Sequence, residues 1–204
     1  MAEAAASVQH REILLRELQH RVKNNFQIIL SSIGIQKRRF DDPAIHRALD
    51  HVANRINAIA LAHDQLAIRQ NVYVVNVASY LRALVISIEQ QVDRIVIDFE
   101  ADETELSIER AVPLGLILNE VVTNSIKHAF DEAGGRISIT LQTGVGFGEG
   151  RLTISDNGGG IKKPNTDGSG LKLIDSLARQ IGGEVHRESS PMGTSTSILF
   201  PLIS

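Results

Sequence analysis

The sequence predicts an α+β fold in which an N-terminal helical hairpin precedes a sandwich of helices and strands. In the first third of the chain, apolar residues recur at the three- and four-residue spacing of helices. After Asn71 the pattern changes to alternating, strand-like segments interleaved with helical ones. Hydrophobic residues make up 43% of the 204 residues and Cys and Trp are absent, so an aliphatic core without disulfides must hold the fold together.

The hairpin is predicted from two apolar repeats separated by a break. A first helix is expected from about Ser7 to Phe40, and a second begins at Pro43. Asp41-Asp42-Pro43 supplies a capping residue and a proline suited to a first helical turn. The first repeat contains Leu15, Leu18, Val22, Phe26, Ile29 and Ile33, and the second contains Ile45, Leu49, Val52, Ile56, Ile59, His63 and Leu66.

Apolar stripes of this width exceed what two helices bury against each other. A second copy of the hairpin would complete a four-helix bundle, so we predict a homodimer. The alternative is that the stripes dock on the second domain of the same chain.

The remainder of the chain is predicted to be one mixed domain. We therefore divide the chain into residues 1–70 and 71–204, with a hinge near Ile68–Tyr73. Pro113 is expected in the first turn of its helix. Helices are expected at Val77–Gln90, Pro113–Phe130 and Gly170–Ile181, and strands at Tyr73–Val75, Arg94–Glu100, Arg136–Thr143, Arg151–Asp156, Glu184–Glu188 and Thr194–Phe200.

Charge and composition exclude several function classes. The formal net charge of −3 argues against a nucleic-acid binder that works mainly by electrostatics. The absence of Cys excludes thiol catalysis and Cys-ligated metals. No apolar run approaches the ~18 residues of a membrane span, and the first residues lack the features of a signal peptide. We expect a soluble, cytoplasmic protein.

The first motif with chemical potential surrounds His20. It lies two residues before Val22, about 200° around a helix, and so points away from the apolar stripe, on a face shared with Lys23 and Asn24. An exposed imidazole, substantially neutral near pH 7, offers a ring nitrogen to a phosphorus atom, and Asn24 could bind the phosphoryl group or position a water. The alternative is a solvated surface histidine, one of seven in the chain.

The second motif lies on the predicted helix at 113–130. Glu120 and Asn124 are one turn apart, and a carboxylate beside a carboxamide oxygen suits Mg²⁺, which keeps waters and substrate phosphates as its other ligands. Lys127 follows on nearly the same face and could reach phosphate oxygens. The alternative is an Asn–Glu hydrogen-bonded helix surface.

Two glycine-rich segments complete the set. Asp156, at the end of a predicted strand, could accept a hydrogen bond from an exocyclic amine such as that of adenine, although a β-turn explains the segment equally well. Gly168 and Gly170 open a helix whose free N–H groups favour phosphate. His63, on the hairpin seam, is expected to pack in the core and receives no functional role.

Taken together, the order and spacing of these segments resemble the transmitter region of bacterial two-component sensor histidine kinases of the HisKA_2/HWE type. The mark of that type is the run His20-Arg-Val-Lys-Asn-Asn25. The resemblance covers nearly the whole chain and implies a dimerisation and histidine-phosphotransfer hairpin followed by a GHKL (Bergerat) ATP-binding domain. It also implies the cofactors ATP and Mg²⁺.

The resemblance implies a role for each motif residue. His20 is similar to the autophosphorylated histidine, Asn124 to the asparagine that ligates Mg²⁺, and Glu120 to a catalytic acid or base of related ATPases. The remaining matches are to nucleotide contacts, at Lys127, His128, Asp156, Gly158, Gly160, Gly168, Gly170, Leu171 and Ser197.

The resemblance implies that His20 passes its phosphoryl group to an aspartate of a response-regulator receiver domain. The signal would arrive through a separate sensor domain or partner. Arg21 stands where the larger kinase family has an acidic residue, which leaves the base that deprotonates His20 unassigned, with Glu17 and Glu120 as candidates. Two other functions stay open: a non-catalytic phosphotransfer protein with a degenerate ATP-binding domain, and a serine kinase of the anti-sigma type.

Overall fold

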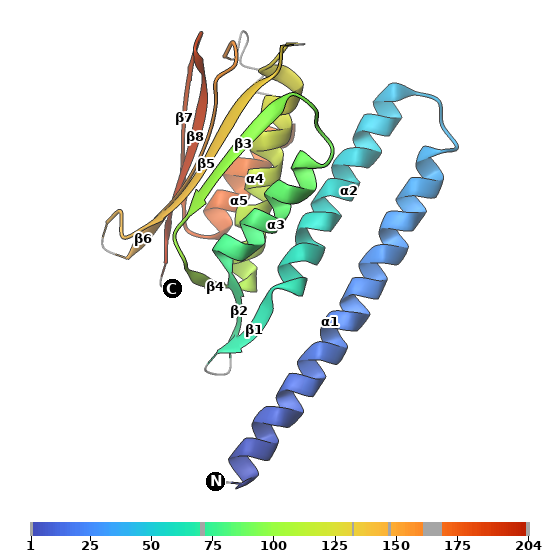
Figure 1. Ribbon diagram of the computed structural model, residues 1–204, viewed down its shortest axis with the longest axis vertical. Helices are drawn as coiled ribbons and strands as arrows, with labels where there is room; N and C mark the ends of the chain where they lie inside the picture. Colours follow the sequence, from blue (N-terminus) through green and yellow to red (C-terminus); the bar gives the residue numbers. More distant parts are fainter. Residues whose placement is uncertain (1, 70–71, 132, 147, 161–168, 203–204) are drawn as a thin grey trace.

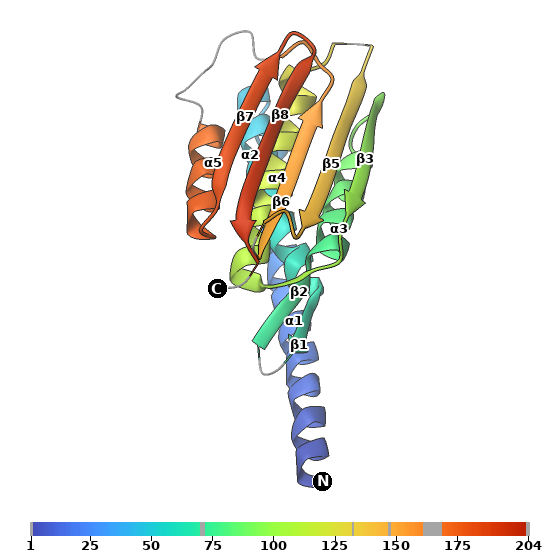
Figure 2. The same ribbon diagram turned by 90° about the vertical axis from the view of Figure 1, so that its left-hand side faces the viewer.

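The computed structural model describes residues 2–69, 72–131, 133–146, 148–160 and 169–202. It consists of a long helical hairpin lying against a domain in which helices cover one face of a five-stranded sheet (Figures 1 and 2). This arrangement confirms the predicted α+β fold.

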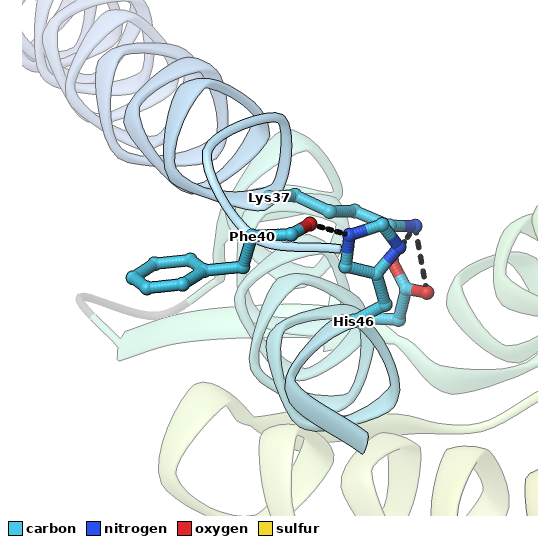
Figure 3. A network of polar contacts seen from close by, with 4 residues as sticks. Lys37, Phe40 and His46 are labelled. Atoms are coloured by element: carbon cyan, nitrogen blue, oxygen red, sulfur yellow. Dashed lines mark hydrogen bonds and ion pairs between the residues drawn. The ribbon is translucent and has the colours of Figure 1, made fainter. Parts of the chain in front are cut away.

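The hairpin is formed by helices α1 (Ala2–Lys37) and α2 (Pro43–Asp64). As the sequence predicted, α2 begins at Pro43, and Oδ1 of Asp42 caps it by accepting a hydrogen bond from the N–H of Ala44 at 2.7 Å. Figure 3 shows the polar contacts beside the turn, where a ring nitrogen of His46 lies 2.6 Å from the carbonyl oxygen of Phe40. The ammonium of Lys37 binds both carboxylate oxygens of Asp50, at 2.7 and 2.8 Å, and joins the two helices.

Helix α2 lies between α1 and the second domain (Figure 1), where it packs against α3 (Val77–Glu89) and α4 (Ile108–His128). Tyr80 of α3 is fully buried and donates a hydrogen bond to the carbonyl of Ala58 in α2 at 3.0 Å. A side chain at Gly115 of α4 would overlap the Tyr80 ring. Within one chain, therefore, α2 docks on the second domain, whereas α1 leaves its outer face exposed.

A small sheet joins the two parts of the chain. It consists of β1 (Leu66–Arg69), β2 (Val72–Asn76) and β4 (Glu105–Ser107), in the order β1-β2-β4. Within the predicted hinge at Ile68–Tyr73, residues 68–69 belong to β1 and residues 72–73 to β2, which pair in antiparallel fashion, while residues 70–71 lie outside the described residues. Strands of three and four residues are too short to produce a recognisable alternation, so the sequence predicted only β2.

The main sheet has the strand order β3-β5-β6-β8-β7, in which β3 and β5 are parallel and the other neighbours antiparallel. All five strands were predicted, each to within three residues at either end. Their bounds are Ile95–Ala101 for β3, Gly135–Thr143 for β5, Glu149–Asp156 for β6, Glu184–Ser190 for β7 and Gly193–Pro201 for β8.

Helices α3, α4 and α5 (Ser169–Gln180) cover one face of this sheet (Figure 2). Helix α4 begins at Ile108, five residues before the predicted start, so Pro113 lies inside the helix and not in its first turn. Proline removes one N–H from the helix ladder, but α4 is buried between the sheet and α2, and tertiary packing outweighs that loss. Because α4 is buried on both sides, polar side chains on this helix are unusual and need hydrogen-bond partners.

Strand alternation decides which side chains of the main sheet face the helices. On β6 and β8, Leu152, Ile154, Ile198 and Phe200 are at most 1% exposed, so even-numbered positions of these strands face the helices. Odd-numbered positions face the open side of the sheet, where the hydroxyls of Thr153 and Ser197 lie 2.7 Å apart.

Candidate active site

His20 is exposed on α1 and borders a cavity of about 320 Å³ between α1 and the end of α2. Gln19, Lys23 and Asp64 line the same cavity. The side chain of Gln19 fixes the two helices here, since its amide donates to the carbonyls of His63 at 3.3 Å and Leu66 at 2.9 Å. The candidate phosphoacceptor is thus held on a well-anchored segment with room for an incoming group.

Charged side chains share the cavity with His20, and an aromatic pair packs between α1 and α2 nearby in the chain. Nζ of Lys23 binds Oδ2 of Asp64 at 3.2 Å, and Asn24 is exposed beside them. The ring of Phe26 lies 5.9 Å from that of His63, and burial lowers the pKa of His63 below its ordinary value. His63 therefore packs at the seam, the role expected of it.

Glu120 and Asn124 of α4 converge on the beginning of α5. A Cβ atom placed on Gly170 would lie 3.2 Å from Oε2 of Glu120 and 3.6 Å from Nδ2 of Asn124. The carboxylate and the carboxamide therefore lie together against the first turn of α5, where a side chain at Gly170 would crowd them. Oxygen ligands beside a helix N-terminus suit a divalent cation that carries phosphate.

Glu120 has a second partner that sequence reasoning missed. Its side chain is only 2% exposed, and Oε1 accepts a hydrogen bond from Nε of Arg55 on α2 at 2.7 Å. A buried carboxylate needs such a partner, because leaving its charge unpaired would be costly. The hairpin thus reaches directly into the candidate site, and no local motif around Arg55 signals this contact.

Asp156 is held in place by three donors from three segments. Its Oδ2 accepts from the hydroxyl of Ser125 on α4 at 2.8 Å, and its Oδ1 accepts from the N–H groups of Gly158 at 3.1 Å and Thr194 at 3.2 Å. A carboxylate fixed this way keeps lone pairs for a further donor such as an amine. The structure therefore links the helix of Asn124 to the strand end that was predicted to contact adenine.

The glycines after Asp156 are required by the backbone itself. A Cβ on Gly158 would lie 2.2 Å from the carbonyl oxygen of Ala129. Gly160 has a φ of +69°, which disfavours other residues, and a Cβ there would lie 2.0 Å from the carbonyl oxygen of Ser190. Both positions bring the loop close to α4 and β7, where a larger residue would push the strand end out of place.

The remaining predicted positions are placed as follows. Lys127 and His128 are exposed at the end of α4, and Leu171 is half-buried in the first turn of α5. Gly168 lies outside the described residues.

Ser197 is not brought to the Asp156 side of the sheet. Its hydroxyl pairs with Thr153 on the open face, whereas Thr196 points toward the helices, is 4% exposed and shares the face of Asp156. The alternation of the last strand was the signal that distinguishes the two, because Ile198 and Phe200 mark even positions as buried.

Lys127 contacts the hairpin as well. Its ammonium donates to Nε2 of His51 on α2. Burial, followed by the charge of Lys127, lowers the pKa of His51 below 6.5. Burial also lowers the pKa of Lys127, and the negative charge of Glu120 partly offsets that decrease. With the Arg55–Glu120 pair, this contact fastens α2 to α4.

This contact predicts a pH dependence of stability. The pKa of His51 is lower in the folded protein than in the unfolded chain, so below pH 6.5 the folded state binds fewer protons. The free energy of unfolding therefore keeps its full value above pH 6.5 and decreases as the pH falls through the folded pKa. We expect urea unfolding to show a smaller free energy at pH 5.5 than at pH 7.5. His51→Gln should reduce that difference, while His186→Gln, at an exposed position on β7, should leave it unchanged. Equal pH dependence in wild type and His51→Gln would contradict the assignment.

The structure brings together the nucleotide-side residues but keeps His20 apart from them. Glu120, Asn124 and Gly170 share one space, whereas α2 lies between α4 and the helix that carries His20 (Figure 1). Within the described residues, no three acidic or histidine side chains gather to hold a metal by themselves. The donor set at Gly170 fits Mg²⁺ bound mainly through nucleotide phosphates.

No helix in the described part of the chain is both long and apolar enough to cross a membrane.

Comparisons with known proteins agree with this geometry. A family model described as "Histidine kinase" (HisKA_2) matches residues 17–92. A second model, for the "Histidine kinase-, DNA gyrase B-, and HSP90-like ATPase" family, matches residues 109–204. The histidine kinase domain of the blue-light-activated histidine kinase EL346 of Erythrobacter litoralis has a similar structure. The TM-score is 0.69 at 28% identity, covering 92% of this chain and 93% of that one.

Two similar curated proteins are sensor kinases of greater length. Blue-light-activated histidine kinase 2 of Erythrobacter litoralis is 29% identical over 199 residues, which is 92% of this chain and 57% of the relative. Sensor histidine kinase PdtaS of Mycobacterium tuberculosis is 28% identical over 201 residues, which is 94% of this chain and 40% of the relative. This chain spans about half the length of the curated relatives that it matches. It belongs to the sensor histidine kinases, as a transmitter region of the HisKA_2 type.

Proposed function

We propose that the protein is an ATP-dependent histidine autokinase that phosphorylates His20. The observation that carries the proposal is the convergence of Glu120 and Asn124 on the glycine at the start of α5, beside a firmly held Asp156. Such a space accepts phosphates and a cation on one side and an amine on the other. The same chain presents an exposed imidazole next to an open cavity.

In this proposal the chain divides its work between residues 1–70, which accept and transfer phosphate, and residues 71–204, which bind ATP. Asn124 and Glu120 hold Mg²⁺, and Lys127 and His128 face the phosphates. The cation, when bound, would neutralise charge on the transferred phosphoryl group. Asp156 accepts the adenine amine, and Gly158 and Gly160 bring their loop close to the nucleotide. Gly170 and Leu171, in the first turn of α5, and Gly168 before it contact the nucleotide as well, and Thr196 takes the position first predicted for Ser197.

Autophosphorylation requires the ATP-binding domain to move relative to the hairpin. Helix α2 separates His20 from Asn124, and Arg55 and His51 bind the α4 side chains that would face the nucleotide. Phosphoryl transfer depends on positioning, so the reaction must release this arrangement. In this proposal, the arrangement in which α2 covers α4 is the resting state. Asn24 lies beside His20, where it would bind the phosphoryl group after transfer.

We also propose that the phosphoryl group passes from His20 to an aspartate of a response-regulator receiver domain. The exposed position of His20 on a rigid helix supports this step, because a partner can approach it directly. Labelling with γ-labelled ATP tests the proposed function: acid-labile label on the protein supports it, and acid-stable label or no nucleotide binding contradicts it.

The outer face of α1 supports the homodimer. Leu14, Leu18 and Ile29 are 55%, 44% and 44% exposed. They lie within about 60° on the helix, and α2 leaves them exposed. A matching face from a second copy would bury them in a four-helix bundle.

We expect the double variant Leu18→Glu/Ile29→Glu to convert the dimer into a monomer, because two buried charges per protomer would face each other across the bundle. Size-exclusion chromatography with light scattering measures the result. Val96→Glu, at a 51% exposed apolar position of β3 in the other domain, is the matched control and should stay dimeric. A wild-type protein that is monomeric at high concentration would exclude the bundle.

A further inference from the structure

The structure changes the choice of base for His20. Glu17, one candidate from the sequence, is bound at 2.6 Å by Nε of Arg21 on the exposed surface of α1. Glu120, the other, is 2% exposed in the second domain and is bound by Arg55. Neither carboxylate borders the cavity that His20 lines.

A different carboxylate does border that cavity. Asp64, the last residue of α2, lines it together with His20, and its Oδ2 is bound by Lys23, one turn after His20 on α1. Three contacts fix the end of α2 against α1 at this level: the two hydrogen bonds of Gln19 and the packing of Phe26 on His63. Contacts at His63, just before Asp64, and at Leu66, just after it, thus hold Asp64 at the level of His20.

We propose that Asp64 is the positioning residue for His20, and this rests on the proposed function. A neutral imidazole carries one proton, and the nitrogen without it must face the nucleotide. A carboxylate that accepts a hydrogen bond from the other nitrogen selects this tautomer and orients the ring. The hydrogen bond from Lys23 occupies Oδ2 of Asp64, and the carboxylate has further lone pairs for that purpose.

The transfer step then balances without another group. A bond forms between the ring nitrogen of His20 and the γ-phosphorus of ATP. The bond from that phosphorus to the bridging oxygen breaks, and its electron pair leaves with ADP. The ring would become a cation, but the proton on its other nitrogen passes to the carboxylate of Asp64 and from there to water. Lys23 lines the same cavity, where its ammonium holds Oδ2 of Asp64 at 3.2 Å.

The experiment compares carboxylate variants in labelling with γ-labelled ATP. We expect Asp64→Asn to lower the initial rate about 100-fold, a typical effect for a lost proton acceptor, with the KM for ATP unchanged. Asp64→Glu should recover at least a tenth of the wild-type rate. Sodium acetate should raise the rate of Asp64→Ala in proportion to its concentration, because the emptied cavity admits a small carboxylate.

Two controls separate this role from a structural one. Asp50→Asn removes a second lysine–aspartate pair between α1 and α2 and should change the rate by less than twofold. Glu17→Gln tests the rival base. The proposal is overturned if Glu17→Gln or Asp50→Asn loses as much activity as Asp64→Asn, or if Asp64→Asn keeps a rate within threefold of wild type.

The two proposals fail in different ways. Label that persists in His20→Ala overturns the proposed function itself. Label that requires His20 but not Asp64 overturns only the inference about Asp64. If Asp64→Asn does not fold, by circular dichroism, the acetate series on Asp64→Ala and the rate of Asp64→Glu decide. No acetate response together with an inactive but folded Asp64→Glu protein contradicts a carboxylate role.

Discussion

Replacing His20 with alanine should reduce acid-labile phosphate incorporation from ATP to background, with nucleotide binding unchanged. His20 lies on α1, which α2 separates from the residues around Gly170, so removing its ring does not touch the nucleotide site. An alanine is also a good helix former at an exposed helical position and should preserve the hairpin. Labelling measures the first effect, and a fluorescent ATP analogue measures binding.

The matched control for this substitution is His186→Ala, at an exposed histidine of β7 in the other domain. It should keep the full rate of labelling. Label that persists in His20→Ala would place the acceptor at another residue. Loss of nucleotide binding in the same variant would mean that the hairpin shapes the nucleotide site more than the structure indicates.

Asn124→Ala should nearly abolish autophosphorylation while leaving the hairpin intact. The carboxamide lies beside the carboxylate of Glu120 at the first turn of α5. Losing one preorganised group that stabilises charge raises the barrier by about 3–4 kcal/mol, so we expect a rate a few hundred-fold lower. Initial rates of labelling at saturating ATP measure the change.

Gln142→Ala removes an exposed amide from β5, outside the site, and serves as the control. Its rate should match that of the wild type. If Asn124→Ala retains more than a tenth of the wild-type rate, Asn124 does not carry the role that we propose for it. Magnesium titration then distinguishes a weakened metal site, which higher concentrations restore, from a displaced phosphate.

The element pattern was largely predictable because helix and strand periodicities are local. The start of α2 at Pro43 followed from Asp42 and Pro43, and the five strands of the main sheet followed from alternation. The predicted start of α4 was wrong because Pro113 suggested a first helical turn. In the structure the helix is buried on both sides and continues through this proline. The strands β1 and β4 were missed because three or four residues carry too little pattern.

The candidate site was predictable only within each motif. The four-residue spacing of Glu120 and Asn124 placed them on one face of a helix, and the structure brings both to Gly170. Strand alternation would have favoured Thr196 over Ser197, but that required knowing which face the helices cover. The partners Arg55 and Asp64 had no motif of their own.

The sequence by itself determined the α+β architecture, the exposed face of His20 and the local geometry of each motif, because those depend on neighbours within one or two turns. Only the tertiary structure decided what the hairpin touches. Arg55 meets Glu120 across 65 positions of the chain, and Lys23 meets Asp64 across 41. Such pairs depend on how α2 sits against α1 and α4, and that register is set by packing among all three helices.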